Sequence, residues 1–196
     1  MKKLLIVVDV VNDFVDGTLG TPEAVEIIPA VLEKIKAYRR EGQDIVFLRD
    51  THFEDYLETR EGRYLPVAHT IRGSHGWLVA DAIRAEIDTD AYPNLEKDTF
   101  ACRALGDLIA GYKELPAIEL VGICTGICVI SNAFFIKALY PEADLSVDAA
   151  CCSCVSRDSH ERALEIHEAL PHRYCKRLKT LQKPPPGDTP EGGLSL

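Results

Sequence analysis

Residues 121–129 read VGICTGICV, and this segment decides the fold class. An apolar stretch ends near Val121, a glycine-containing turn follows, and a helix is expected to begin near Ile127. A buried strand that leads through a turn into a helix is the repeating unit of α/β proteins with parallel sheets. Cys128 then falls in the first helical turn, where the helix dipole and free N–H groups favour a thiolate. Cys124, which precedes the helix, is the competing nucleophile, and a small packed residue is the ordinary alternative for either.

Strands and helices alternate on both sides of this segment. Short apolar runs predict buried strands at residues 4–8, 45–48, 117–121 and 145–147. Helical patterns begin at Thr21-Pro22, with a restart at Pro29 and a stop at Gly42, and recur at residues 77–87, 105–112, 127–140 and 156–170. This order predicts an α/β fold of three layers, α/β/α, with a mainly parallel, doubly wound sheet. Residues 50–76 show no clear periodicity, and so long a loop is usually functional.

Length and composition narrow the class further. The 196 residues suit one domain, which we expect at residues 1–180, followed by a loosely ordered tail rich in Pro and Gly at residues 181–196. A formal charge of −9 without a basic cluster argues against nucleic acid as a partner. No apolar run reaches the roughly eighteen residues of a membrane span. Seven cysteines, an odd number, fit reduced thiols in a cytoplasmic protein better than a secreted disulfide scaffold.

Polar side chains follow three of the predicted strands. Asp9 comes after the first strand, Asp50 and His52 after the second, and the two cysteines of residues 124–128 after the third. Because ligands of open α/β sheets bind at the carboxyl ends of the strands, we expect a site at this edge. A buried carboxylate is costly without a partner or a task, so Asp9 is a candidate base, with a turn or capping role as the alternative.

A metal site is a second hypothesis for the same edge. Asp50, His52 and, after a further loop, His69 offer one carboxylate and two imidazoles, which suit Zn²⁺, Fe²⁺ or Mn²⁺. Histidines in loops are as often merely solvated, and that alternative stays open. The cysteines at positions 151, 152 and 154 lack a second C-x-x-C pair, so we interpret them as small packed residues. His160 and His167 share a helix face and are interpreted as surface or packing residues.

Five short segments in a fixed order resemble the isochorismatase-like cysteine hydrolases, and among them the nicotinamidase branch. The resemblance covers about residues 3–176 and rests on VVDVVNDF at 7–14, the Lys97 segment, the Cys128 segment, VDA at 147–149 and HERAL at 160–164. One departure is Gly126, because many members of the family carry Asp after the Thr.

The resemblance implies roles for residues that the pattern alone leaves open. Asp9 would be the general base, Lys97 its electrostatic partner and Cys128 the nucleophile. Lys97 taken by itself reads as an ordinary exposed lysine. The family also has a cis peptide bond here, between Ile123 and Cys124, and an oxyanion hole made by the N–H groups of Cys124 and Cys128.

The nicotinamidase branch further implies a divalent metal, zinc with iron or manganese as alternatives, on Asp50, His52 and His69. Glu61 would be the fourth ligand, with Glu58 as the second choice.

The same branch implies an aromatic pocket for a pyridine ring. Phe14, Tyr64 and Leu65 would line it, although position 65 is usually aromatic in the family.

The implied activity is hydrolysis of nicotinamide to nicotinate and ammonia, a reaction of NAD metabolism, through a thioester on Cys128. We expect a homo-oligomer. The alternatives are another amidase of this family acting on a carbamoyl or ureido group, and a non-enzymatic metal or thiol protein on the same scaffold.

Overall fold

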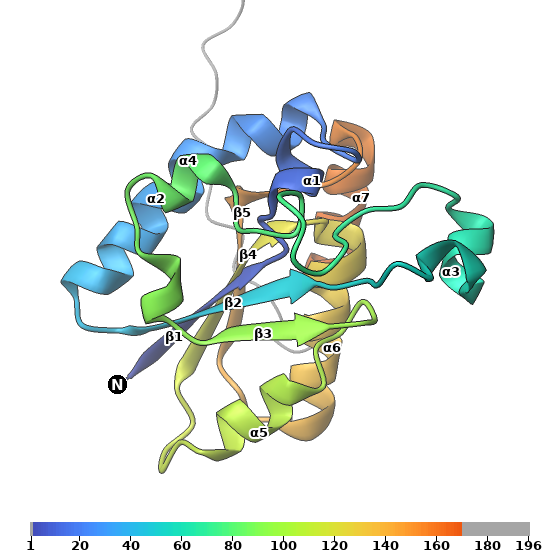
Figure 1. The fold of residues 1–196 in the computed structure, drawn as a ribbon. Helices are drawn as coiled ribbons and strands as arrows, with labels where there is room; N and C mark the ends of the chain where they lie inside the picture. The colour runs from blue at the N-terminus through green and yellow to red at the C-terminus, as the bar shows by residue number, and fades with distance from the viewer. Residues whose placement is uncertain (1, 170–196) are drawn as a thin grey trace, which may run out of the picture.

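The centre of the molecule is a five-stranded, fully parallel sheet (Figure 1). The computed structural model describes residues 2–169. Its strands are β1 (Lys3–Val8), β2 (Asp44–Asp50), β3 (Asn94–Lys97), β4 (Ala117–Ile123) and β5 (Leu145–Ser153), in the spatial order β3-β2-β1-β4-β5. The chain order reverses at β1, so a crevice opens at the carboxyl ends of β1 and its neighbours β2 and β4.

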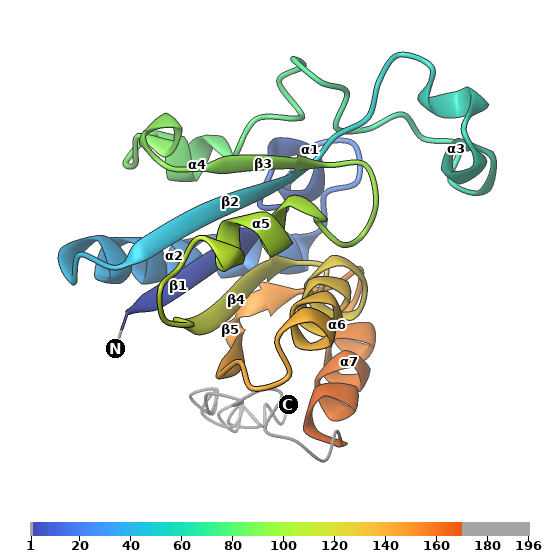
Figure 2. The same cartoon turned by 90° about the horizontal axis from the view of Figure 1, so that it is seen from below.

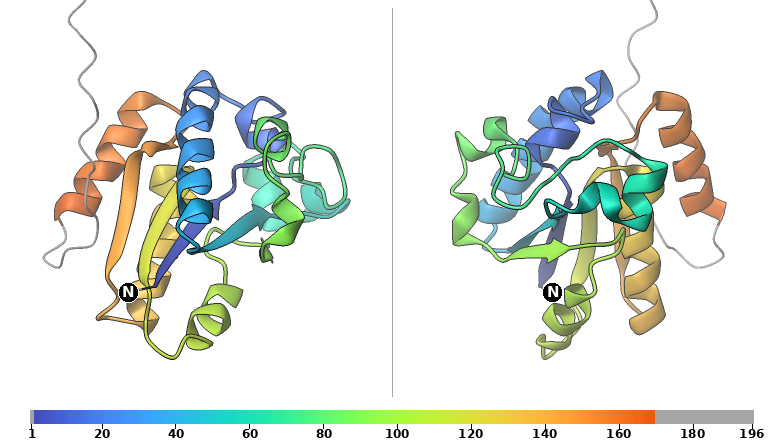
Figure 3. Two further views of the ribbon diagram at one scale, coloured as in Figure 1. Left: turned by 90° about the vertical axis from the view of Figure 1, so that its left-hand side faces the viewer. Right: turned by 45° about the vertical axis from the view of Figure 1, so that its right-hand side comes forward.

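Helices cover both faces of this sheet, as the views from below and from the sides show (Figures 2 and 3). The elements α1 (Asn12–Val15), α2 (Pro22–Arg40) and α4 (Asp81–Arg84) contribute to the core on one face, and α5 (Ala104–Ala110) and α6 (Ile130–Leu139) to the core on the other. Strand β1 alternates between these cores, with Leu5 and Val7 in the first and Leu4 and Ile6 in the second. The three-layer fold predicted from the sequence is confirmed.

Two peripheral helices complete the described chain. Helix α7 (Arg157–Ala169) lies beside α6 near the β5 edge, and the short α3 (Arg60–Tyr64) projects away from the sheet on the long loop after β2 (Figure 2). No helix within residues 2–169 combines the length and apolar character that a membrane crossing requires. The predicted tail at residues 181–196 and Cys175 lie outside the described residues.

Several predicted helix boundaries were wrong. Helix α2 does not restart at Pro29 but runs through it, because Ile28, Val31 and Ile35 belong to one buried face that spans the proline. The predicted helix at 77–87 shrinks to the four residues of α4, since Val79 instead forms an isolated bridge with Val11.

The strand predictions fell short at the carboxyl side of the sheet. Strand β5 continues to Ser153, well beyond the predicted end at Val147, and β3 was not predicted from its four residues, only one of which is buried. Before α6 the backbone forms one π-helical turn (Thr125–Val129) where a helix start near Ile127 was expected. The missed strand β3 carries Lys97, and the π-helical turn carries Cys128.

Candidate active site at the sheet edge

Asp9 occupies the first position after β1 and is fully buried. Its backbone has a positive φ of 52°, and its N–H donates to the Leu48 carbonyl at 3.0 Å. The carboxylate accepts a hydrogen bond from the Asp50 N–H at 2.8 Å, which fixes its direction. Burial raises the pKa of Asp9 to about 6, and the charge of Lys97 opposes part of that rise.

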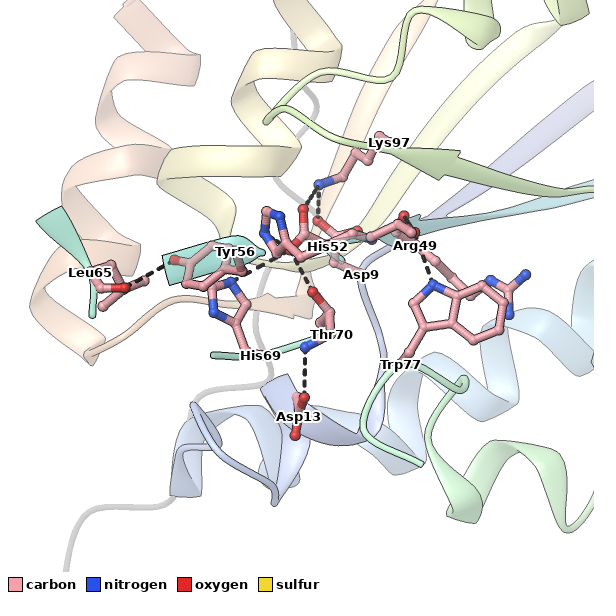
Figure 4. A network of polar contacts seen from close by, with 12 residues as sticks. Asp9, Asp13, Arg49, His52, Tyr56, Leu65, His69, Thr70, Trp77 and Lys97 are labelled. Atoms are coloured by element: carbon pink, nitrogen blue, oxygen red, sulfur yellow. Dashed lines mark hydrogen bonds and ion pairs between the residues drawn. The ribbon is translucent and has the colours of Figure 1, made fainter. Parts of the chain in front are cut away.

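Lys97 ends strand β3 and brings the one cation of this group into the crevice (Figure 4). Its Nζ lies 2.8 Å from Asp9 Oδ2, 3.1 Å from Asp50 Oδ1 and 3.6 Å from Cys128 Sγ, and its side chain is 1% exposed. Burial lowers the pKa of Lys97, but the charge of Asp9 and its other acidic neighbours outweigh burial and raise it. The interpretation of Lys97 as an exposed lysine, taken from its local sequence, was therefore wrong.

Cys128 completes this group from the π-helical turn. Its thiol donates a hydrogen bond to the Asp9 carboxylate, and burial, followed by the charge of Asp9, raises the pKa of Cys128. The Cys124 carbonyl accepts from the N–H groups of Ile127 and Val129, both at 3.1 Å, which fixes the turn around Cys128. The expected cis peptide bond between Ile123 and Cys124 is present. The resting site thus pairs a protonated thiol with a carboxylate placed to accept its proton.

Asn132 connects the Cys128 turn with the loop after Lys97, a role the sequence did not reveal. Its amide donates to the Cys128 carbonyl at 2.8 Å and to the Phe100 carbonyl at 3.1 Å, while its Oδ1 accepts from the Cys102 N–H at 2.8 Å. The side chain is fully buried, so these bonds lie away from competing water.

The three candidate metal ligands come together beside this group. One ligand atom from each of Asp50, His52 and His69 lies within 4.8 Å of the others. Asp50 Oδ2 faces His52 Nε2 at 3.0 Å and His69 Nε2 at 3.6 Å. His52 Nε2 is buried and lacks a hydrogen-bond partner of good geometry. The Val67 carbonyl accepts a hydrogen bond from His69 Nδ1 at 2.7 Å, which leaves His69 Nε2 available to bind a metal. This donor set fits a divalent transition metal.

Further groups hold these ligands in position (Figure 4). Thr70 Oγ1 donates to Asp50 Oδ2 at 2.9 Å, and the Thr70 N–H donates to Asp13 at 2.7 Å. The Tyr56 ring packs on His52 and His69, with ring centroids 4.5 and 4.9 Å apart. Although burial opposes ionisation, His52 and Lys97 hold the pKa of Asp50 well below its usual range. Neither Thr70 nor Tyr56 stood out in the sequence, because each is a single residue in an aperiodic loop.

A cavity of about 220 Å³ is lined by Cys128 and by two of the candidate metal ligands, Asp50 and His69. Phe14 and Leu65 line it, as expected. Tyr64 does not line the cavity. Its side chain is 81% exposed, because it lies at the end of the outlying helix α3, and only the next residue, Leu65, reaches the cavity. Glu61 also lines the cavity, but its carboxylate is not part of the compact ligand group of Asp50 and the two histidines, and Glu58 is exposed.

Two histidines of α7 contact the turn that carries Cys128. The ring of His160 lies with Nδ1 2.7 Å from Thr125 Oγ1, and that hydroxyl also donates to the Ser153 carbonyl at 3.0 Å. His167 is 2% exposed and its ring hydrogen-bonds the Thr125 backbone. The interpretation of His160 and His167 as surface or packing residues was therefore incomplete, because both side chains also hold Thr125, the residue after Cys124, in position.

The fold and the site define a class: three-layer α/β proteins with a buried acid, lysine and thiol at the carboxyl edge of a parallel sheet. The profile of the isochorismatase domain matches residues 3–171. A Bacillus subtilis protein, described as an uncharacterized isochorismatase family protein PncA, is 32% identical over 143 residues, which cover 68% of this chain and 77% of that one. The chain belongs to the isochorismatase family, and the family expected from the sequence is confirmed.

Solved structures share the fold. The pyrazinamidase of Pyrococcus horikoshii in complex with zinc is 24% identical with a TM-score of 0.76, covering 92% of this chain and all of that one. The nicotinamidase/pyrazinamidase PncA of Bacillus subtilis is 23% identical with a TM-score of 0.76 over 86% of this chain and 96% of that one. The N-carbamoylsarcosine amidase of Thermoplasma acidophilum is 25% identical with a TM-score of 0.70 over 90% of this chain and 96% of that one.

Proposed function

We propose that this chain is a metal-assisted cysteine amidohydrolase that converts nicotinamide to nicotinate and ammonia. The observation that carries the proposal is the buried group in which Lys97 Nζ lies 2.8 Å from Asp9 and 3.6 Å from Cys128. An acid, a cation and a thiol in mutual contact are the parts that nucleophilic catalysis requires. Membership of the isochorismatase family and the likeness to nicotinamidases support the same reaction class.

The first half of the reaction follows from the hydrogen bond between Cys128 and Asp9. Asp9 takes the thiol proton as the sulfur attacks the carboxamide carbon, and Lys97 stabilises the negative charge that the pair retains. The N–H groups of Cys124 and Cys128 receive the oxyanion of the tetrahedral intermediate. Asp9 then returns the proton to the departing ammonia, which leaves a thioester on Cys128.

In the second half of the reaction, which hydrolyses the thioester, Asp9 again accepts a proton and then gives it back. A water molecule attacks the thioester while Asp9 accepts its proton, and the proton returns to the sulfur as the carboxylic acid leaves. Lys97 remains charged throughout, because its acidic neighbours raise its pKa. Asp9 therefore shuttles one proton in each half, and its burial, which raises its pKa to about 6, suits a group that must both accept and return it.

The cavity favours an uncharged ring amide. Asp50, His52 and His69 would hold a divalent metal ion, which supplies a Lewis acid for a ring nitrogen when bound. Phe14 and Leu65 offer apolar walls for the ring. Among the described residues that line the cavity none is Lys or Arg, so a substrate carboxylate would meet no basic lysine or arginine side chain there.

The test is ammonia release from nicotinamide by the native chain, by Cys128→Ala and by the matched control Cys152→Ala. Cys152 is a buried thiol in the same core cluster as Cys128 but does not line the cavity. We expect Cys128→Ala to lose more than about 1,000-fold in kcat and Cys152→Ala to remain within a few-fold. Full activity in Cys128→Ala would refute the thioester route.

The likeness to an N-carbamoylsarcosine amidase supports a second candidate, an amidase acting on a ureido group. Such a substrate carries a carboxylate, and among the described residues no Lys or Arg side chain lines the cavity to pair with it. The same assay with an N-carbamoyl amino acid decides between the two. Release of ammonia from that compound but not from nicotinamide would favour the second candidate.

A further inference from the structure

Two thiols outside the Asp9, Lys97 and Cys128 group line the same cavity. Cys124 directly follows β4 and Cys154 directly follows β5. These strands are neighbours, and their register pairs Ile123 with Ser153, so the two cysteines are the next residues along adjacent strands. Adjacent strands lie roughly 4.8 Å apart, and disulfides join Cα atoms that are roughly 4.4–6.8 Å apart. The backbone spacing therefore suits a bond between the two sulfurs.

The two side chains already contact each other through a hydrogen bond between the thiols. The surroundings of the two sulfurs differ, because Cys154 also accepts hydrogen bonds from the N–H groups of Gly126 and Val155 and from Ser159. The hydrogen bond from Cys124, followed by these donors, lowers the pKa of Cys154 to about 5, while the same contact and burial raise the pKa of Cys124. The opposite directions of the two pKa shifts favour Cys154 over Cys124 as the thiolate of the pair.

Gly126 permits this arrangement. A Cβ atom at this position would lie 3.9 Å from Cys154 Sγ and 3.1 Å from the Ala163 Cβ. An aspartate here, which many family members carry, would bring a carboxylate next to a sulfur that the present backbone surrounds with N–H donors. The glycine and the cysteine are therefore compatible features of this chain, and an acidic side chain would work against the thiolate.

We propose that Cys154 and Cys124 form an oxidisable dithiol pair that reacts with small hydroperoxides and closes to a disulfide beside the nucleophile. The Cys154 thiolate attacks one peroxide oxygen, which breaks the O–O bond, gives a sulfenic acid and releases hydroxide. Cys124 loses its proton to that hydroxide, which gives the first water. Its sulfur then attacks the sulfenic sulfur and expels a second hydroxide, which becomes the second water by taking up the proton that Cys154 released when it ionised. In sum two thiols and one hydrogen peroxide give one disulfide and two waters, so the peroxide is the only oxidant needed.

The disulfide would also stop hydrolysis, a consequence that rests on the proposed function. Cys124 supplies an N–H of the proposed oxyanion hole, and the bond would tie this residue to the end of β5. A cross-link across the cavity wall alters the backbone donor and narrows the space for the substrate. We expect dithiothreitol to restore activity, because the bond is a simple disulfide.

The decisive experiment maps disulfides in the full-length Cys128→Ala protein treated with a small excess of hydrogen peroxide, then alkylated and digested with trypsin. In this variant Cys124 is the one cysteine between Lys113 and Lys137, so any cross-link to that peptide identifies it. We expect a loss of about two mass units and a disulfide between Cys124 and Cys154. This disulfide should be absent when Cys154→Ser is added to the variant. It should be retained when the matched control substitution Cys152→Ser is added instead. No link, or a link that survives Cys154→Ser, would overturn the proposal.

Mapping in the native chain needs no substitution, so a variant that fails to fold leaves the test intact. For activity, native protein and Cys154→Ser are each compared with their own untreated rate. We expect the native rate to fall at least tenfold with peroxide and to recover with dithiothreitol, and the variant to keep most of its rate. A mapped disulfide in a protein that releases no ammonia would reject the proposed hydrolysis alone, and ammonia release without the disulfide would reject the thiol pair alone.

Discussion

Gly122 is the residue at which the sheet tolerates no side chain. It has a φ of +125°, and a Cβ atom there would lie 2.0 Å from the Val8 carbonyl oxygen of the paired strand. Strand β1 and strand β4 therefore approach closely just before their site residues, Asp9 and Cys124. A close backbone approach of this kind is possible with glycine alone.

We expect Gly122→Ala to destabilise the protein by more than about 4 kcal/mol or to prevent folding, because backbone must move to admit the methyl group. Gly42→Ala is the control. That residue also has a positive φ, of 63°, but a Cβ atom there meets nothing within 4 Å, so we expect a loss of about 1 kcal/mol. Urea denaturation of both variants checks this, and equal losses would contradict the explanation by close approach.

The titration of Cys154 can be followed by alkylation. Its neighbours are the Cys124 thiol, the Ser159 hydroxyl and the N–H groups of Gly126 and Val155. Arg157, His160 and Glu161 line a second pocket to which Cys154 also contributes. Because the pKa of Cys154 is lowered to about 5, its thiolate predominates above that pH and is lost as the pH falls through it.

The rate of iodoacetamide labelling at Cys154 should therefore stay flat from about pH 6.5 to 8, whereas an ordinary thiol gains about tenfold per pH unit in that range. Labelling is measured by mass spectrometry in Cys128→Ala, with Cys151, whose pKa is raised to about 12, as the internal control. A rate at Cys154 that rises with pH in parallel with Cys151 would contradict the shift.

At the scale of residues, the sequence identified those whose chemistry needs a strand end. Asp9, Asp50 and Cys128 follow apolar runs, and such runs mark buried strands whatever their partners. Lys97 needed the family resemblance, because an isolated lysine in a polar segment has no periodic signal. Cys154 was interpreted as packing, because three of its hydrogen-bond partners, Cys124, Gly126 and Ser159, belong to other elements and no local pattern reports them.

At the scale of elements, α2 carries an internal proline that its packing outweighs. Pro29 has no N–H, so the carbonyl one turn earlier lacks its helical hydrogen bond. Because the Pro29 side chain is exposed, an alanine there loses no core contact.

We expect Pro29→Ala to raise the free energy of unfolding by about 1–3 kcal/mol, reduced somewhat by the greater freedom of the unfolded chain. Pro22→Ala is the matched control, because Pro22 lies at the first turn of the same helix, where the missing N–H costs nothing. Thermal unfolding of both variants gives the comparison. A stability gain at Pro22 as large as at Pro29 would show that the helical hydrogen bond is not the cause.

The elements that the sequence missed have a common physical reason. Strand β3 is four residues long at the sheet edge, so it shows neither the apolar run nor the alternation of a longer strand. Strand β5 continues through small cysteines and alanines, whose burial depends on α2 and α7 rather than on their own composition. The three central strands, β2, β1 and β4, are buried on both faces, and their apolar runs were sufficient to predict them from the sequence.

At the scale of the whole molecule, the proposed metal ligands come from both ends of a long loop. Asp50 ends β2, and His69 lies beyond the helix α3. A metal ion would therefore close this loop against the sheet. A ligand that binds the folded chain stabilises it by about 2.7 kcal/mol at a free concentration of 100 Kd.

We expect added Zn²⁺ to raise the Tm of the metal-stripped native chain and a chelator to reverse the rise. His52→Ala should lose this response, whereas the control His75→Ala, at an exposed histidine outside the ligand group, should keep it. Fe²⁺ and Mn²⁺ can be compared in the same way. The ligand assignment fails if His52→Ala and the native chain respond alike.

The two oxygens of Asp50 face different halves of the site, since Oδ1 contacts Lys97 and Oδ2 faces His52 and His69. A bound metal ion and the Lys97 cation would therefore compete for the negative charge of Asp50. Because the coupling is reciprocal, a change that removes one cation should strengthen the binding of the other. We expect Lys97→Met to bind Zn²⁺ roughly 5- to 150-fold more tightly than the native chain in a chelator competition, and an unchanged or weaker affinity would contradict this. Asp50 thus couples the strength of metal binding to the charge beside the proposed nucleophile, so that a substitution in one half of the site also alters the other half.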